Sequence, residues 1–304
     1  MATLATTPAA PAEETALPAP AGGPRRPRRR HRNVTSAGPL TYVLLIVSAL
    51  VSIFPLYWTL VAGSHTNHDI AATPPPFLPN ATLFTNLKLA LEQAPIGKAI
   101  LNSIIVSGCI TLGTVFCCTL AGFAFAKLSF RGSGFLLALV IGTMMVPTQL
   151  GIIPLFILIA KLHWVNQLQA VVLPTLVSAF GVFFMRQYLS QALPNELLEA
   201  GRVDGASTNR IFWSIVVPIA RPAMAVLGML TFLTAWNDFF WPIIALTTDN
   251  PTVQVALAGL GTGYVPQRSI IMAGTLLGTL PVLVVFVVLG KQIVGGIMQG
   301  AVKG

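Results

Sequence analysis

Six long apolar segments constrain the fold of this sequence more than any other feature. A helix needs about 20 mostly apolar residues to cross the hydrocarbon core of a bilayer. Only 9% of the residues are charged, whereas soluble domains average about 25%. The sequence therefore predicts an all-α membrane protein with six transmembrane helices. The expected spans are 40–62, 99–125, 134–160, 168–188, 222–246 and 270–292.

The distribution of positive charge predicts how these helices are oriented. Fourteen of the 18 Lys and Arg residues lie before the first span, in alternate loops and after the last span, and four lie in the other loops. Cytoplasmic segments carry the excess of Lys and Arg. Both termini are therefore expected in the cytoplasm of a cell with a bacterial-type inner membrane.

Residues 1–39 differ in composition from the rest of the chain. They are rich in Ala, Pro, Thr and Arg, so they bury too little apolar surface to fold, and we expect a disordered cytoplasmic arm. The basic run Arg25 to Arg32 fits a contact with anionic lipid better than one with nucleic acid. A secretory signal peptide is a poorer interpretation, because the apolar run that follows is too long. Residues 40–304 form the expected membrane domain.

The sequence offers little for catalysis or metal binding. No G-x-x-x-x-G-K-[ST] phosphate loop occurs, so the usual device for binding nucleotide phosphates is missing. No Cys spacing suits a metal or a disulfide framework. His65, His68 and Asp69 could form a loose metal site, but a solvated loop explains them better. We expect no catalytic residue, no metal and no cofactor.

The loop 193–218 is expected to hold a short helix, a glycine turn and a second helix. Asn195 is the expected N-cap of the first helix and Ser207 that of the next, while Gly205 can adopt the left-handed conformation that ends a helix. Leu197, Ala200 and Gly201 share one face by the i, i+3, i+4 rule. Such a face could enter a groove of a partner protein; the alternative is a helix lying on lipid.

This loop resembles the EAA loop of binding-protein-dependent ABC importers. Glu199-Ala200-Gly201, three residues, Gly205, nine residues and Ile215-Val216-Val217-Pro218 reproduce the family spacing E-A-A, three, G, nine, I-x-L-P. The sequence departs from the pattern at Gly201 and Val217, both with small or conservative changes. The resemblance assigns coupling to an ATPase to Glu199, Ala200, Gly201, Asp204, Gly205 and Pro218.

Five further motifs, spread over residues 40–304, resemble the carbohydrate permeases related to the smaller membrane subunit of the maltose importer. The resemblance implies that a separate cytoplasmic ATPase dimer hydrolyses ATP, that a second, non-identical permease completes the path, and that an extracytoplasmic binding protein delivers a sugar. By analogy with the related maltose system, the outer loop 247–269 is expected to approach that binding protein. The motifs are Leu101-Asn102-Ser103, Val146-Pro147-Thr148-Gln149 with Ile153-Pro154, Phe184-Met185-Arg186-Gln187-Tyr188, Ala235-Trp236-Asn237-Asp238-Phe239-Phe240-Trp241-Pro242 and Gly300-Ala301-Val302-Lys303-Gly304.

A solute path needs polar groups inside the bundle. Asp238 is the only acidic residue in an expected span, although a structural role is open for it as well. The prolines at 147 and 154 predict an interrupted third span, which would either border a path or only bend the helix. The candidate path residues are Asn102, Gln149, Asn237 and Asp238.

Two further features predict packing. Trp236, Phe239, Phe240 and Trp241 are expected to form an aromatic belt near the outer interface. Gly274 and Gly278 have a spacing that lets two helices approach closely.

Two other kinds of transporter remain as alternatives. One is an importer permease for a non-sugar solute. The other is a secondary transporter that works alone, for which ionisable groups near the midplane of the bilayer would be expected.

Overall fold

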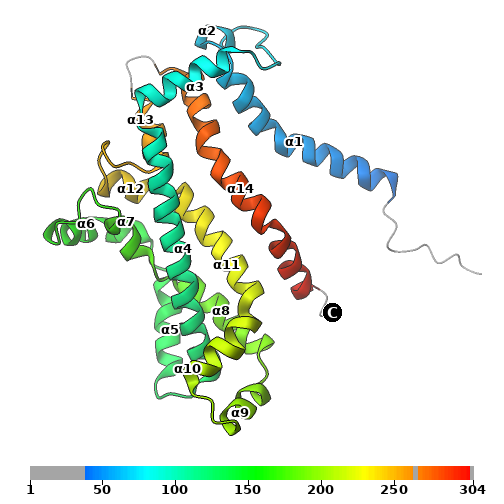
Figure 1. Cartoon of the computed structure of the whole chain (residues 1–304), viewed down its shortest axis with the longest axis vertical. Coiled ribbons are helices and arrows are strands. Elements are labelled where there is room, and N and C mark those ends of the chain that lie inside the picture. The colour runs from blue at the N-terminus through cyan, green and yellow to red at the C-terminus, as the bar shows by residue number, and fades with distance from the viewer. Residues whose placement is uncertain (1–37, 263–265, 302–304) are drawn as a thin grey trace, which may run out of the picture. The chain divides into compact units, whose positions relative to one another are not determined.

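The structure, a computed structural model, describes residues 38–262 and 266–301, and these residues form helices without a strand (Figure 1). The chain divides into two units, 1–52 and 53–304, and α1 (Pro39–Gly63) begins in the first and ends in the second. Residues 1–37 of the predicted arm 1–39, residues 263–265 of the predicted outer loop and the last three residues of the C-terminal motif lie outside the described residues. The elements after α1 are α2 (Asn67–Ile70), α3 (Thr82–Gln93), α4 (Ile96–Lys127), α5 (Ser133–Thr143), η1 (Thr148–Gly151), α6 (Ile152–Lys161), α7 (Gln169–Val172), η2 (Leu173–Thr175), α8 (Ala179–Ala192), α9 (Asn195–Val203), α10 (Thr208–Ile211), η3 (Phe212–Val216), α11 (Val217–Asn237), α12 (Phe240–Ala245), α13 (Val253–Gly259) and α14 (Arg268–Ala301).

Four described helices are long and apolar enough to cross a membrane, or six if each of two bent pairs is counted as one span. The bent pairs are 133–143 with 148–161, at 91°, and 169–175 with 179–192, at 43°. The first break contains Pro147, as the sequence predicted. A proline interrupts a helix because it removes a backbone hydrogen bond and its ring clashes with the preceding turn. Pro154 lies in the first turn of α6, where no such bond is lost.

The fifth span differs from the sequence prediction at both ends. A continuous helical segment runs over Thr208–Asn237 instead of 222–246, and both Pro218 and Pro222 lie within it. It ends at Asp238, which is extended and accepts a hydrogen bond from the backbone N–H of Phe240 through Oδ1 (3.1 Å). That side chain offers the backbone an alternative to another helical turn.

The main core lies where α4 packs against α8 and α11 (Figure 1). Met185 and Leu189 of α8 are fully buried there, together with Cys118 of α4. The Tyr188 hydroxyl donates a hydrogen bond to the Ile219 carbonyl (3.2 Å) and joins α8 to α11. The motif Phe184-Met185-Arg186-Gln187-Tyr188 therefore contributes to helix packing.

Gly122 permits the closest approach in this core. A Cβ atom at Gly122 would lie 2.7 Å from the Met185 Cβ and 2.8 Å from the Arg186 backbone nitrogen. Small residues that bring two backbones together are a common basis of helix packing in membranes. The α4–α8 contact therefore needs a glycine at position 122.

Gly274 and Gly278 also serve packing, but against side chains of a short helix. A Cβ atom at Gly278 would lie 2.7 Å from the Val253 Cγ1, and one at Gly274 would lie 3.1 Å from the Leu257 Cδ2. Both neighbours belong to α13. The two glycines thus seat α13 against α14.

Only part of the expected aromatic belt is exposed. Phe239 and Phe240 are exposed, whereas Trp236 and Trp241 are buried. The Trp241 Nε1 donates a hydrogen bond to the Ala170 carbonyl of α7 (2.9 Å). Because the chain turns at Asp238, the second tryptophan enters the protein core.

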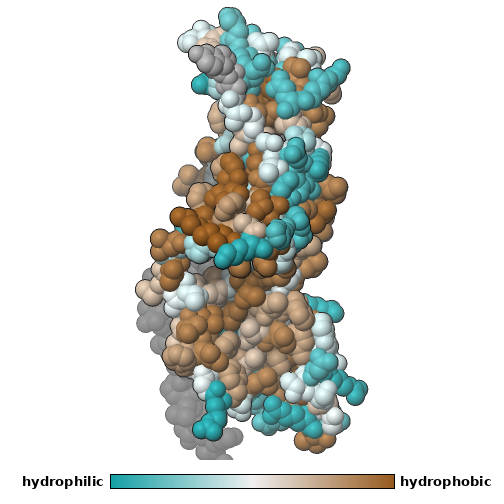
Figure 2. Space-filling model, turned by 90° about the vertical axis from the view of Figure 1, so that its left-hand side faces the viewer, coloured by the Kyte–Doolittle hydropathy of each residue, from teal (hydrophilic) through white to brown (hydrophobic). Residues whose placement is uncertain are grey.

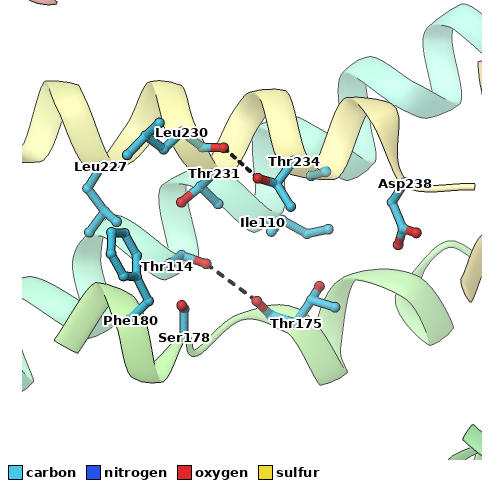
Figure 3. A pocket seen from close by; sticks show the side chains of 11 residues that line it. Ile110, Thr114, Thr175, Ser178, Phe180, Leu227, Leu230, Thr231, Thr234 and Asp238 are labelled. Atoms are coloured by element: carbon cyan, nitrogen blue, oxygen red, sulfur yellow. Dashed lines mark hydrogen bonds between the residues drawn. The ribbon is translucent and has the colours of Figure 1, made fainter. Parts of the chain in front are cut away.

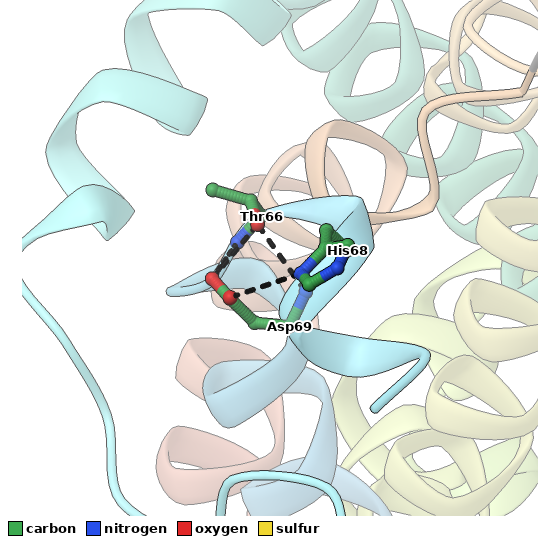
Figure 4. A network of polar contacts seen from close by, with 3 residues as sticks. All are labelled: Thr66, His68 and Asp69. Carbon is green, nitrogen blue, oxygen red and sulfur yellow. Dashed lines mark hydrogen bonds and ion pairs between the residues drawn. The ribbon is translucent and has the colours of Figure 1, made fainter. Parts of the chain in front are cut away.

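Polar contacts order the segment after α1. Thr66 caps α2 reciprocally: its Oγ1 accepts from the Asp69 N–H, and its own N–H donates to the Asp69 carboxylate (Figure 4). His65 is buried, and its Nδ1 lies 2.9 Å from the Val61 carbonyl. Asp69 and His65 therefore have structural roles, and the described residues contain no group of three His, Cys, Asp or Glu side chains that could hold a metal.

The surface in Figure 2 is mostly hydrophobic, with hydrophilic residues toward both ends and in one patch between them. Leu136 and Leu139 of α5 and Phe183 of α8 are among the exposed apolar residues. Such a surface suits contact with lipid or with other apolar helices.

The fit at Gly122 gives a first testable prediction. Gly122→Ala should lower the thermal midpoint of the protein in detergent, because overpacking of this kind costs about 1–3 kcal/mol. The matched control is Gly108→Ala on the same helix, where an added Cβ meets nothing within 4 Å. Equal midpoints for the two variants would contradict the assigned packing.

Candidate functional site

The loop 193–218 forms two helices, α9 and α10, joined by a turn at Gly205. Gly205 has a φ of +74°, and the Ser207 side chain accepts a hydrogen bond from the Arg210 N–H. Both features confirm the sequence prediction. Glycine adopts this left-handed conformation without the clash that a Cβ atom would bring.

The predicted N-cap of α9 was wrong. Pro194 occupies that position, and Asn195 is the first helical residue. The Asn195 Oδ1 instead accepts a hydrogen bond from the Lys127 Nζ (2.9 Å) at the end of α4. The expected local capping contact is thus replaced by one from 68 residues earlier in the chain.

Only part of the predicted docking face of α9 is exposed. Gly201 is buried, and a Cβ atom there would lie 3.3 Å from the Ile215 Cδ1. It therefore faces the chain's own second helix, together with the buried Leu198. Leu197 and Ala200 remain exposed.

The exposed face of α9 combines apolar and acidic residues. Leu197 is 44% exposed and Val203 is 88% exposed. Glu199 and Asp204 are exposed as well, and no described residue forms an ion pair with either of them. An apolar face with uncompensated carboxylates lies open to solvent on this loop.

Pro218, the last residue of the motif, is not at a loop end. It is the second residue of α11, which follows α10 and the π-helical turn η3 without interruption. The π-helical turn allows the backbone to continue past a residue that lacks an N–H. The loop is therefore joined to the fifth membrane segment by a continuous helical segment.

Asn102 does not face an open path. It is buried, and its Nδ2 donates hydrogen bonds to the Asn250 Oδ1 (3.0 Å) and to the Pro251 carbonyl (2.9 Å). The neighbouring Ser103 Oγ accepts from the Val253 N–H (2.8 Å). The motif Leu101-Asn102-Ser103 thus anchors the loop before α13.

The other two amide candidates lie in exposed positions. Gln149 belongs to the short helix η1 within the bent third span. The Asn237 Nδ2 donates to the Leu233 carbonyl of its own helix (2.8 Å). Asp238, the fourth predicted path residue, lines a cavity whose wall includes none of the other three.

That cavity has a volume of about 640 Å³ and lies between α4, the η2–α8 segment and α11 (Figure 3). Asp238 is at one end, and Leu227 and Phe180 are at the other (Figure 3). Five hydroxyl side chains separate the two ends, in a largely apolar wall. They are Thr114, Thr175, Ser178, Thr231 and Thr234.

These hydroxyl residues were not predicted. On α11 the positions 227, 231, 234 and 238 follow a helical period, so one face carries two threonines and leads to the carboxylate. That periodicity could have predicted that these residues of α11 line one wall of a cavity. Nothing local in the sequence indicated that Thr114 and Thr175 lie opposite.

Residues 118–297 match the family described as "Binding-protein-dependent transport system inner membrane component". The chain is 33% identical over 263 residues to the lactose transport system permease protein LacG of Rhizobium radiobacter, covering 86% of this chain and 95% of the relative. It is 31% identical over 269 residues to the sn-glycerol-3-phosphate transport system permease protein UgpE of Yersinia pestis, covering 85% and 95%.

Two further similarities extend this result. The arabinooligosaccharides transport system permease protein AraQ of Halalkalibacterium halodurans is 35% identical over 204 residues, covering 67% of this chain and 73% of the relative. A solved bacterial ABC transporter involved in the import of the acidic polysaccharide alginate has a similar fold, with a TM-score of 0.70 at 22% identity. The match covers 83% of this chain and 94% of that chain.

The anchoring role of Asn102 gives a second prediction. Asn102→Ala should speed amide hydrogen exchange in residues 250–256 about tenfold, because a lost hydrogen bond is worth about 1–1.5 kcal/mol. The control is Asn237→Ala, which removes only a bond within one helix. Exchange in this segment that stays as slow as in the unmodified protein would contradict the anchoring role.

Proposed function

Because this chain belongs to the family of binding-protein-dependent transport system inner membrane components, we propose that it is the sugar-carrying permease subunit of an ATP-driven importer. The observation that carries the proposal is similarity to transport permeases over most of the chain, combined with an exposed helix α9 between two membrane segments. Family members of this kind are multi-pass membrane proteins and transport subunits rather than enzymes. ATP hydrolysis is assigned to a separate subunit.

The membrane arrangement of the proposal has six spans, with the two bent helix pairs each crossing once. Both termini and the loop 193–218 lie in the cytoplasm. The excess of Lys and Arg in these segments supports this orientation. A second permease subunit is expected to complete the path.

The coupling proposal concerns the exposed face of α9. Leu197, Ala200 and Val203 would pack in a cleft of the cytoplasmic ATPase, and Glu199 would meet a cationic or hydrogen-bonding group there. Gly201 and Gly205 would act indirectly, by holding α9 in place against α10. Pro218 lies in the first turn of α11, which continues the helical segment that begins in this loop.

Sugar is the proposed cargo because relatives are named for lactose and for arabinooligosaccharides. The relative named for sn-glycerol 3-phosphate keeps a non-sugar solute as the second candidate. In either case an extracytoplasmic binding protein would deliver the solute, and Asp238 would line the path. Asn102 and Asn237 would support that path from outside the cavity.

Affinity purification from the native membrane in mild detergent tests the proposal, with mass spectrometry of the recovered proteins and ATP-dependent uptake in liposomes. Recovery of an ATPase, a second multi-span protein and ATP-dependent sugar uptake would support it. Solute uptake by the purified chain alone without ATP would replace it with a secondary transporter. Uptake of glycerol 3-phosphate and of no sugar would select the second candidate.

The third prediction concerns Glu199. Glu199→Arg should lower ATP-dependent uptake at least tenfold, because it places a positive charge where the partner is expected to accommodate a negative one. Membrane insertion should be unchanged, since the side chain is exposed. Glu92→Arg on α3 reverses an exposed charge elsewhere and should leave uptake near normal. Normal uptake in the Glu199 variant would contradict the docking assignment.

The fourth prediction concerns the turn at Gly205. Gly205→Val should reduce uptake strongly, because a β-branched residue is strained at a φ of +74°. Gly205→Asn should retain more uptake, since Asn tolerates this conformation. The comparison is made by uptake in membranes with matched amounts of each variant. Equal uptake by the two would show that the backbone conformation is not what matters.

A further inference from the structure

The hydrogen bonds around the cavity leave its walls with more free hydrogen-bond acceptors than donors. Three of its threonine hydroxyls donate toward backbone carbonyls, two at normal length and Thr114 in a long contact. The Thr175 and Thr234 hydroxyls therefore keep oxygen lone pairs and have no donor left to offer. The bonds run from Thr114 to Thr175 (3.4 Å), from Thr175 to Val171 and Val172 (2.9 and 3.0 Å) and from Thr234 to Leu230 (2.8 Å).

Asp238 adds further acceptor capacity. One of its carboxylate oxygens accepts from the Phe240 N–H, and the side chain faces the cavity beyond Thr234 (Figure 3). An ionised carboxylate accepts hydrogen bonds and donates none. Ser178 and Thr231 differ from these three threonines. The Ser178 Oγ accepts from the Gly181 N–H and its proton remains available, and the Thr231 hydroxyl has no hydrogen bond to another described residue.

No Lys, Arg or His is among the described residues that line the cavity. An anion entering it would meet a negative charge and several oxygen lone pairs without a compensating cation. Between apolar walls that repulsion is screened less than in water. A phosphate or carboxylate group is therefore poorly matched to these walls.

A neutral sugar fits the same walls well. Its hydroxyl groups supply the donors that the threonines and Asp238 can accept. Its apolar ring face can lie against Phe180, Leu227 or Leu230, which line the other part of the cavity.

We infer that this cavity recognises neutral polyhydroxylated solutes and disfavours anionic ones, and that Asp238 is the residue that sets this preference. The inference rests on the proposed function, because it narrows the cargo of the permease. The inferred preference for neutral solutes would distinguish this chain from a carrier of phosphorylated or acidic solutes.

The inference is tested by the charge selectivity of a thiol placed in the cavity. Thr231→Cys is made in the full chain with Cys109 and Cys117 replaced by Ala, while Cys118 stays because it is buried. Reaction rates with a cationic trimethylammonium methanethiosulfonate and with an anionic sulfonate analogue are measured in membranes. Each is normalised to the rate with free 2-mercaptoethanol, and the parent without Thr231→Cys gives the background.

We expect the normalised cationic rate to exceed the anionic rate about tenfold. Asp238→Asn should reduce that ratio several-fold, whereas Asp238→Glu should keep it. Asp249→Asn is the matched control, because it neutralises an exposed carboxylate outside the cavity. An anionic rate that equals or exceeds the cationic rate, or a ratio unaffected by Asp238→Asn in protein that elutes normally on gel filtration, would overturn the inference.

Uptake then tests the solute preference itself. The purified complex in liposomes is offered lactose, an arabinose trisaccharide and sn-glycerol 3-phosphate. Faster uptake of a neutral solute than of the phosphate supports the inference, and faster uptake of the phosphate overturns it. Absence of ATP-dependent uptake would contradict the proposed function alone, because the thiol experiment does not depend on transport.

Discussion

The fit of α4 against α8 is the interaction on which the rest of the described structure depends. In a bilayer the backbone must satisfy its own hydrogen bonds, so the spans are helices, and close packing with a few interhelical hydrogen bonds holds them together. Gly122 lets the two helices approach until their backbones nearly touch. This places Met185 and Leu189 in the core, and α11 packs against both helices.

Helix α4 also organises the functional candidates along its length. Near its beginning Asn102 holds the loop at Pro251, and in its middle Thr114 lines the cavity. At its end Lys127 contacts Asn195 of α9. One long helix thus contacts the loop before α13, the proposed solute site and the proposed ATPase-docking loop, so a displacement of α4 would affect all three.

The sequence predicted features whose cause is local. The helix Asn195–Val203, the left-handed Gly205 and the Ser207 cap follow from neighbouring residues, and the structure contains all three. The failures have distant causes. Asn195 binds Lys127 instead of capping its helix, and Gly201 faces Ile215. An amphipathic pattern distinguishes the two faces of a helix. A small residue such as Gly201 does not show whether its face packs against the same chain or against a partner.

The cavity was the hardest part of the structure to predict. It is connected to the loop 193–218 by a single helical segment. Threonine is common in membrane helices, where its hydroxyl often bonds to its own helix, so Thr234 looks unremarkable in the sequence. The segment Thr208–Asn237 begins beside the loop at Ser207 and ends at Asp238 in the cavity. Within it, the π-helical turn Phe212–Val216 precedes Pro218. Because the backbone stays helical through this point, the second helix of the loop and the cavity wall with Thr231 and Thr234 belong to one continuous helical segment.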